Sequence, residues 1–208
     1  MKRAFTIATW RGTAFKLHVT FPLGLLLLSG FTFDPLTWVT VTALVLLHEV
    51  GHLLVVRAVG GRSSEVVLTG FGGWCRWSGE VSPLGRAAIA CGGIAAQLLV
   101  LVPALVLLEL GLMPRGPVLD EVVFALTFRN AWLAAFNLLP VPPLDGAEAW
   151  RFPIELGRAL RRRLTSHRNV VHVGATDFLD TPAEGGDAER AKDIAAQLLA
   201  NARKDEPE

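Results

Sequence analysis

Four long apolar stretches constrain the fold of this 208-residue chain more than any other feature. They cover residues 17–33, 36–59, 87–112 and 118–139. A helix needs about 20 apolar residues to cross the hydrocarbon core of a bilayer, and each stretch is close to that length. Hydrophobic residues make up 51% of the chain, and the mean hydropathy is +0.43. The sequence therefore predicts an all-α polytopic membrane protein with about four transmembrane helices.

The first stretch is the shortest of the four and carries Pro22 near its start. A signal peptide has a similar apolar core, but a cleavage site with small residues follows that core. No such site follows Leu25 to Leu28. We therefore expect residues 1–35 to form an N-terminal cytosolic segment and a first transmembrane helix that is retained.

The second stretch contains an HExxH motif, formed by His48, Glu49 and His52 with Val50 and Gly51 between them. Residues four apart share one face of a helix, so both imidazoles can reach one zinc ion about 2.0 to 2.1 Å away. Glu49 then lies beside the ion, where a carboxylate can take a proton from a bound water. An ionisable residue at the centre of a membrane helix costs about 2.5 to 3.5 kcal/mol on insertion scales. Three such residues within five positions therefore favour a metal site over an ordinary helix.

A third ligand is expected at the end of the fourth stretch. Pro140, Pro142 and Pro143 prevent the helix from continuing, so the backbone must unwind there. Asp145 follows this break, and Gly146 leaves the backbone free to turn the Asp145 carboxylate inward. An alternative is that Asp145 caps the next helix, and both roles are compatible.

Together, HEVGH and the later segment NLLPVPPLDG resemble the paired signatures of the site-2 protease family of intramembrane zinc metalloproteases. The resemblance implies that His48, His52 and Asp145 bind zinc and that Glu49 is the catalytic base. It also implies a three-helix catalytic core within residues 36–146.

Two further segments bear on this resemblance. Residues 66–73, VVLTGFGG, resemble the strand-rich cytosolic loop of the family, so we expect a β-hairpin at 64–82. Its strands would suit β-addition of an unwound substrate, although a plain hairpin cap fits the same pattern. Many family members have a Gly-Pro-x-x-Asn pattern in the middle core helix. This chain has CGGIAAQ there, with Gln97 offering an amide in place of the asparagine.

Polar residues in the fourth stretch have several interpretations. Asn137 is a candidate to stabilise the developing oxyanion through its amide, and it is equally suited to satisfying carbonyls freed by the prolines. Arg129 and Asn130 could contact a bound substrate, or pair with Glu109 or Asp120 across helices.

Basic residues predict the orientation of the spans. With four spans, all three basic clusters fall on one side, which the positive-inside rule makes cytosolic. The predicted protein is thus a multi-pass component of a prokaryotic cell membrane with both termini in the cytosol. The clusters are Lys2, Arg3, Arg11 and Lys16; Arg57, Arg62, Arg76 and Arg86; and Arg151 through Arg168.

The C-terminal third is polar. Residues 147–165 have the pattern of a basic amphipathic helix, which is expected to lie along the cytosolic membrane surface. Residues 166–208 are expected to form a flexible tail, in which 187–202 have the apolar spacing of one short helix. Cys75 and Cys91 lack CxxC spacing and are expected to be reduced thiols.

The favoured function is an intramembrane zinc endopeptidase that cuts in or near transmembrane segments of membrane proteins, as in regulated intramembrane proteolysis. The alternative is a noncatalytic zinc-binding membrane adaptor of the same fold. A metal transporter is disfavoured, because the chain has one compact ligand set and no second site along a path. The expected partners are a transmembrane protein substrate, the lipid bilayer and a regulatory membrane protein, with no nucleic acid.

Overall fold

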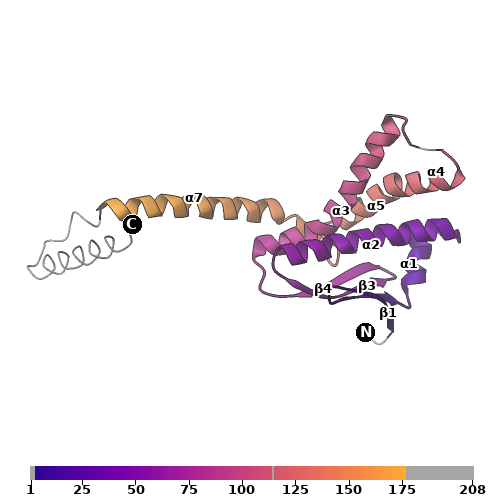
Figure 1. Ribbon diagram of the computed structural model, residues 1–208, viewed down its shortest axis with the longest axis horizontal. Helices are drawn as coiled ribbons and strands as arrows, with labels where there is room; N and C mark the ends of the chain where they lie inside the picture. Colours follow the sequence, from indigo (N-terminus) through magenta and orange to yellow (C-terminus); the bar gives the residue numbers. More distant parts are fainter. Residues whose placement is uncertain (1–2, 114, 177–208) are drawn as a thin grey trace, which may run out of the picture. The chain divides into compact units, whose positions relative to one another are not determined.

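The computed structural model describes residues 3–113 and 115–176 (Figure 1). The chain up to Ala159 forms one compact unit, which contains all the elements that position the site. The described elements are β1 (Ala4–Trp10), β2 (Thr13–His18), α1 (Phe21–Leu28), α2 (Pro35–Ala58), β3 (Arg62–Thr69), β4 (Gly72–Ser78), α3 (Pro83–Glu109), α4 (Pro117–Phe124), the π-helical turn η1 (Ala125–Arg129), α5 (Asn130–Asn137), α6 (Gly146–Ala149) and α7 (Phe152–Thr176).

Helices α2 and α3 are, among the described helices, the two that are individually long and apolar enough to cross a membrane. Asp34 caps α2 by accepting a hydrogen bond from the Thr37 amide at 2.7 Å, and the Ser82 hydroxyl caps α3 in the same way. The two helices touch through their backbones. A Cβ atom at Gly92 would lie 2.8 Å from the Gly51 carbonyl, and one at Gly51 would overlap the Gly92 carbonyl. Glycine at both positions therefore permits a crossing that any side chain would block.

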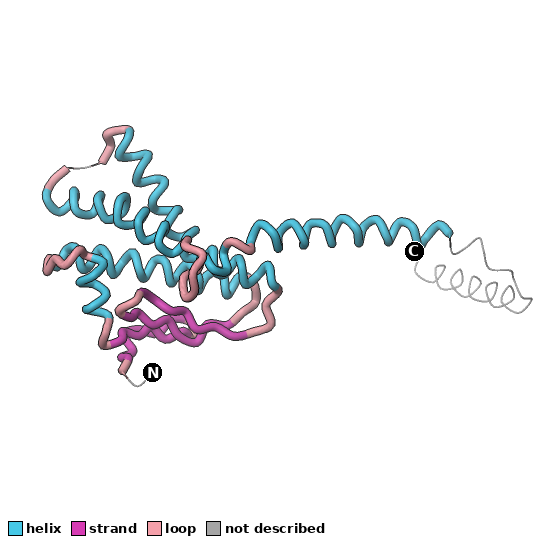
Figure 2. The backbone as a smooth tube through the Cα atoms, turned by 180° about the vertical axis from the view of Figure 1, so that it is seen from behind, coloured by secondary structure: helices cyan, strands magenta, loops and turns pink. Residues whose placement is uncertain are grey.

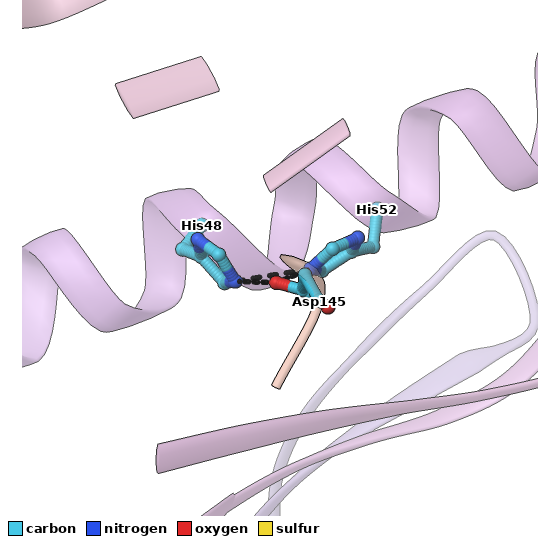
Figure 3. A group of neighbouring side chains, drawn as sticks. All are labelled: His48, His52 and Asp145. Atoms are coloured by element: carbon cyan, nitrogen blue, oxygen red, sulfur yellow. Dashed lines mark hydrogen bonds and ion pairs between the residues drawn. The ribbon is translucent and has the colours of Figure 1, made fainter. Parts of the chain in front are cut away.

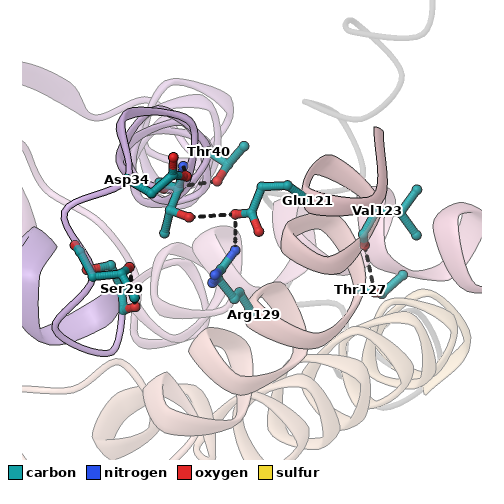
Figure 4. Close-up of polar contacts among 9 residues, drawn as sticks. Ser29, Asp34, Thr40, Glu121, Val123, Thr127 and Arg129 are labelled. Atoms are coloured by element: carbon teal, nitrogen blue, oxygen red, sulfur yellow. Dashed lines mark hydrogen bonds and ion pairs between the residues drawn. The ribbon is translucent and has the colours of Figure 1, made fainter. Parts of the chain in front are cut away.

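The fourth apolar stretch forms one helical segment from Pro117 to Asn137, with the π-helical turn η1 in its middle. In this segment Arg129 forms an ion pair with Glu121, which also accepts a hydrogen bond from the Thr37 hydroxyl at 3.0 Å (Figure 4). Arg129 thus pairs within its own segment. The alternative that it pairs with Glu109 or Asp120 is wrong, because its carboxylate partner is Glu121.

The first apolar stretch does not form the expected transmembrane helix over 17–33. Leu17 belongs to β2, where it pairs with Phe5 of β1 and Leu68 of β3. The helix that follows, α1, has eight residues and is therefore about 12 Å long, far short of a hydrocarbon core of about 30 Å. It ends at Leu28 with Ser29 as its C-cap, and Gly30 then adopts a φ of 72°, which turns the chain toward the cap of α2. Four transmembrane helices are thus not confirmed.

The fold is mostly helical, as predicted, but its sheet has four strands in the order β1-β2-β3-β4 where a two-stranded hairpin was expected (Figure 2). Strands β3 and β4 form the antiparallel hairpin that was expected in this region. The N-terminal hairpin of β1 and β2 adds to it through a parallel pairing of β2 with β3. The Lys16 ammonium on β2 pairs with the Glu65 carboxylate on β3, which lowers the pKa of Glu65. Strands β1 and β4 are the two edges of this sheet.

After the fourth apolar stretch, the helical region extends beyond residue 165, where the predicted helix ended. Helix α6 ends at Ala149, and α7 begins at Phe152 because Pro153 fits the first turn of a helix but not its interior. Backbone helix continues to Thr176, so residues 166–176 are helical where a flexible tail was predicted. The helix predicted at 187–202 lies outside the described residues.

The two cysteines, Cys75 and Cys91, are free thiols, as expected. Burial raises the pKa of the Cys75 thiol in β4, so this thiol is protonated near neutral pH.

Candidate metal centre

Helix α2 presents His48 and His52 on one face, and both side chains are buried. Their Nε2 atoms lie 3.0 Å apart. The Oδ2 atom of Asp145 lies 2.8 Å from Nε2 of His48 and 3.1 Å from Nε2 of His52 (Figure 3). One ligand-type atom from each of three residues therefore converges on a single point between the helix and the loop after α5.

The proline-rich loop brings Asp145 to the histidines. The Trp150 indole N–H donates to the Leu138 carbonyl at 2.8 Å, which ties the far end of the loop to the end of α5. A Cβ atom at Gly146 would overlap the same carbonyl, so glycine is needed for this close approach. Asp145 occupies the N-cap position of α6, but its side chain makes no capping hydrogen bond. Of the two roles considered for Asp145, the structure shows the carboxylate at the histidines.

The second nitrogen of each imidazole has its own partner. Nδ1 of His52 lies 2.7 Å from the Ile89 backbone carbonyl, and Nδ1 of His48 lies 2.9 Å from Oε1 of Gln97. Both partners are assigned as acceptors, so each Nδ1 carries the proton and donates it. Each Nε2 then has a free lone pair, which is the tautomer that a metal-binding histidine requires.

These donors fit a divalent metal ion. Two Nε2 lone pairs and a carboxylate oxygen, separated by 2.8 to 3.1 Å, repel one another unless a metal ion or a proton lies among them. Two histidines and one carboxylate are also a ligand set of catalytic zinc sites, which keep a further position open. Gly93 of α3 lies against the group, because a Cβ atom there would be 2.5 Å from both His48 Cε1 and His52 Nε2. The residues present are therefore compatible with zinc, although other divalent ions accept the same ligand types.

Glu49 lies beside the converging donors but is not one of them. Its side chain is buried, 3% exposed, and it packs against the backbone of Gly73 in β4. A Cβ atom at Gly73 would overlap the Glu49 carboxylate. The sheet thus forms one wall around this carboxylate. The FGG sequence indicated the β-hairpin, but only the packing of β4 on α2 shows that Gly73 leaves room for the Glu49 side chain.

Asn137 is half-buried at the end of α5, and its amide forms no hydrogen bond among the described residues. It is not one of the three converging residues. Its supporting catalytic role stays a prediction. Gln97 contacts His48 directly, which the sequence pattern did not indicate. This contact depends on how α2 and α3 cross.

Two known proteins are similar to this chain. No family model matches the chain. A zinc metalloprotease of Methanocaldococcus jannaschii is 29% identical over 147 residues, which cover 67% of this chain and 42% of the relative. The chain therefore spans less than half the length of that protein. The solved structure of a site-2 protease from the same organism aligns with a TM-score of 0.56 and 22% identity, covering 73% of this chain and 71% of that one. The latter likeness shows a shared fold.

Substituting the glycine beside the histidines should weaken metal binding. We expect Gly93→Ala to lower zinc affinity at least about tenfold, because the added methyl group displaces both imidazoles. Gly73→Ala is the matched control, since its methyl group meets Glu49 and not a metal ligand. The measurement is a zinc titration against a competing chelator in detergent. Equal affinities in the two variants would contradict this assignment of space around the site.

Proposed function

We propose that the chain belongs to the site-2 protease family and that it is an intramembrane zinc endopeptidase, which hydrolyses peptide bonds in or near transmembrane segments of other membrane proteins, as in regulated intramembrane proteolysis. One observation carries the proposal. His48 and His52 of an apolar helix converge with Asp145 from the loop after α5, and the Glu49 carboxylate is buried beside them. The two histidines come from a helix that is apolar enough to cross a membrane, which supports a site at membrane depth.

The chain's own residues can manage the protons of a hydrolysis. His48, His52 and Asp145 would hold a zinc ion, which would supply Lewis acidity toward water and the scissile carbonyl. Glu49 accepts a proton from the attacking water and returns it to the leaving amine. The Gly73 backbone restricts the Glu49 carboxylate to one side of the site. Asn137 is proposed as a supporting donor to the carbonyl oxygen as negative charge develops there.

A substrate must be extended to reach this site. In a transmembrane helix every amide is hydrogen-bonded, so cleavage requires local unwinding. Strand β4 lies at an edge of the sheet, and its Gly73 contacts Glu49. A segment paired with β4 would lie about 4.8 Å from the strand that contacts the proposed base. We therefore propose that β4 holds the unwound substrate by β-addition.

The test of function is cleavage by Glu49→Gln. Several tagged single-span membrane proteins are incubated with wild-type and variant chains in liposomes at matched zinc content. We expect Glu49→Gln to lose at least about 100-fold in cleavage rate while retaining zinc, because glutamine keeps the shape but cannot accept the proton.

Glu80→Gln is the matched control for this substitution, because Glu80 is exposed in the connection between β4 and α3. It should cleave like the wild type. Equal products from wild-type and Glu49→Gln chains, or no products from several substrates despite bound zinc, would favour the noncatalytic adaptor.

Cross-linking tests the β4 edge. In a Glu49→Gln, Cys75→Ser background, a cysteine replaces Arg76 on β4, and single cysteines are scanned along a bound substrate. We expect disulfides at every second substrate position, because side chains alternate along a paired strand. A cysteine in place of Thr6, on the opposite edge strand β1, should give none. Equal cross-linking from both edges, or a pattern without alternation, would exclude β-addition at β4.

The location of the chain is also a proposal. We propose a multi-pass protein of a prokaryotic cell membrane with both termini cytosolic, in which α7 lies on the cytosolic surface.

Along α7, Phe152, Leu156, Leu160 and Leu164 follow one another at intervals of four, and the three leucines are exposed. Arg158 pairs with Glu155, whereas Arg161, Arg162 and Arg163 form no ion pair among the described residues. An apolar stripe with flanking arginines suits an anionic leaflet.

Fluorescence tests the surface helix. In a background of Cys75→Ser and Cys91→Ser, Leu160→Cys carries an environment-sensitive fluorophore. We expect its emission to shift to the blue in nanodiscs with anionic lipid, relative to zwitterionic nanodiscs. Replacing all three arginines of 161–163 by glutamine should remove most of the shift. Thr165→Cys, on another side of the helix, is the control. Identical spectra in both lipids would contradict this placement.

A further inference from the structure

Two completely buried amide side chains connect the fourth apolar segment to the metal centre. Gln97 in α3 and Asn130 at the start of α5 are both 0% exposed. Oε1 of Gln97 accepts the hydrogen bond from Nδ1 of His48 at 2.9 Å. Nδ2 of Asn130 donates to the backbone carbonyl of Gln97 at 3.0 Å. A chain of contacts therefore runs from α5 through α3 to a proposed ligand on α2.

This arrangement is costly if its role is packing alone. Nε2 of Gln97 and Oδ1 of Asn130 are buried without a hydrogen-bond partner among the described residues. A buried amide group that lacks a partner carries a desolvation cost that a leucine or methionine of similar size avoids. The two bonds that these side chains do make are therefore the feature that distinguishes them from apolar residues.

The geometry shows how Gln97 acts. It contacts His48 at Nδ1, whereas Asp145 lies at Nε2, across the same ring. Gln97 is thus on the far side of the imidazole from the point where the donors converge. Its effect on a bound ion must pass through His48, by setting the tautomer and the direction of the ring.

The π-helical turn explains why Asn130 reaches α3. Asn130 follows η1 directly, and a π turn inserts an extra residue that re-aims the side chains after it. The neighbouring Arg129 points to Glu121, which in turn contacts α2 through Thr37. Asn130 instead points to Gln97. This short region therefore contacts both helices that surround the site.

We propose that Asn130 and Gln97 are positioning residues, which hold the His48 ring so that its Nε2 lone pair faces the metal. Asn130 fixes the backbone at Gln97, and Gln97 fixes the imidazole. The inference rests on the proposed function only in requiring that the site binds a divalent metal, and it does not require proteolysis.

The experiment measures metal binding by the full-length chain in detergent. Zinc affinity is obtained by competition with a chelator, and the visible absorption of bound Co²⁺ reports the ligand geometry. We expect Gln97→Met, which keeps the length but loses the acceptor, to weaken zinc binding by about 10- to 100-fold and to alter the Co²⁺ spectrum. Gln97→Glu keeps an acceptor at the same place and should bind within about threefold of the wild type.

The second arm tests Asn130. Asn130→Leu removes the donor and should weaken zinc binding less than Gln97→Met does. In the double variant the effects should not add, because both act through His48. Thr127→Val is the control. Thr127 is also buried, within η1, but its hydroxyl donates to the Val123 carbonyl of the same helical segment, so zinc binding should not change.

Several outcomes would overturn the proposed positioning role of Gln97 and Asn130. Wild-type zinc affinity and an unchanged Co²⁺ spectrum in folded Gln97→Met would do so, as would equal weakening by Thr127→Val. If Gln97→Met does not fold, the comparison of Asn130→Leu with Thr127→Val decides, and equal affinities reject the proposal. If the zinc affinities and Co²⁺ spectra change as expected but the chain shows no cleavage activity, the proteolytic function alone is rejected.

Discussion

The backbone contact between α2 and α3 at Gly51 and Gly92 is the constraint on which the rest of the structure depends. Because no side chain separates the helices there, groups on α3 reach the histidines on α2. These are the Ile89 carbonyl, the Gly93 backbone and the Gln97 amide. A wider crossing would leave each Nδ1 without an acceptor and would open space beside the ligands. The glycines thus matter for the metal site although they bear no ligand atoms.

A second constraint comes from the broken helix after α5. Its prolines stop the hydrogen-bond ladder, and the Trp150 contact with Leu138 closes the loop so that Asp145 returns to α2. The sheet contributes from the other direction, because Gly73 packs on Glu49. The proposed ligands and the proposed base are therefore held by different elements. Changes in β4 can affect the base while the ligand set stays intact, which allows metal binding and chemistry to be separated by substitution.

Some features of the fold could be predicted from residues close together in the sequence, and others could not. The HExxH spacing depends only on helix geometry, and three prolines end a helix in any context, so His48, His52 and Asp145 could be predicted as a group. The β3–β4 hairpin was also accessible, because its strands are adjacent in sequence. The N-terminal strands were missed. Leu17 is apolar enough for a membrane helix, and its actual place depends on a parallel pairing with β3, some 50 residues away.

The sequence by itself determined which residues are candidates for the chemistry, because ligand type, the four-residue interval and the proline break are properties of short stretches of the chain. Only the tertiary structure decided what supports those residues. Gln97 against His48, Gly73 against Glu49 and Asn130 against Gln97 join positions between 24 and 49 residues apart. No local pattern encodes such pairs, since they arise from how closely helices and sheet pack. That packing also decided that part of the first apolar stretch joins a sheet.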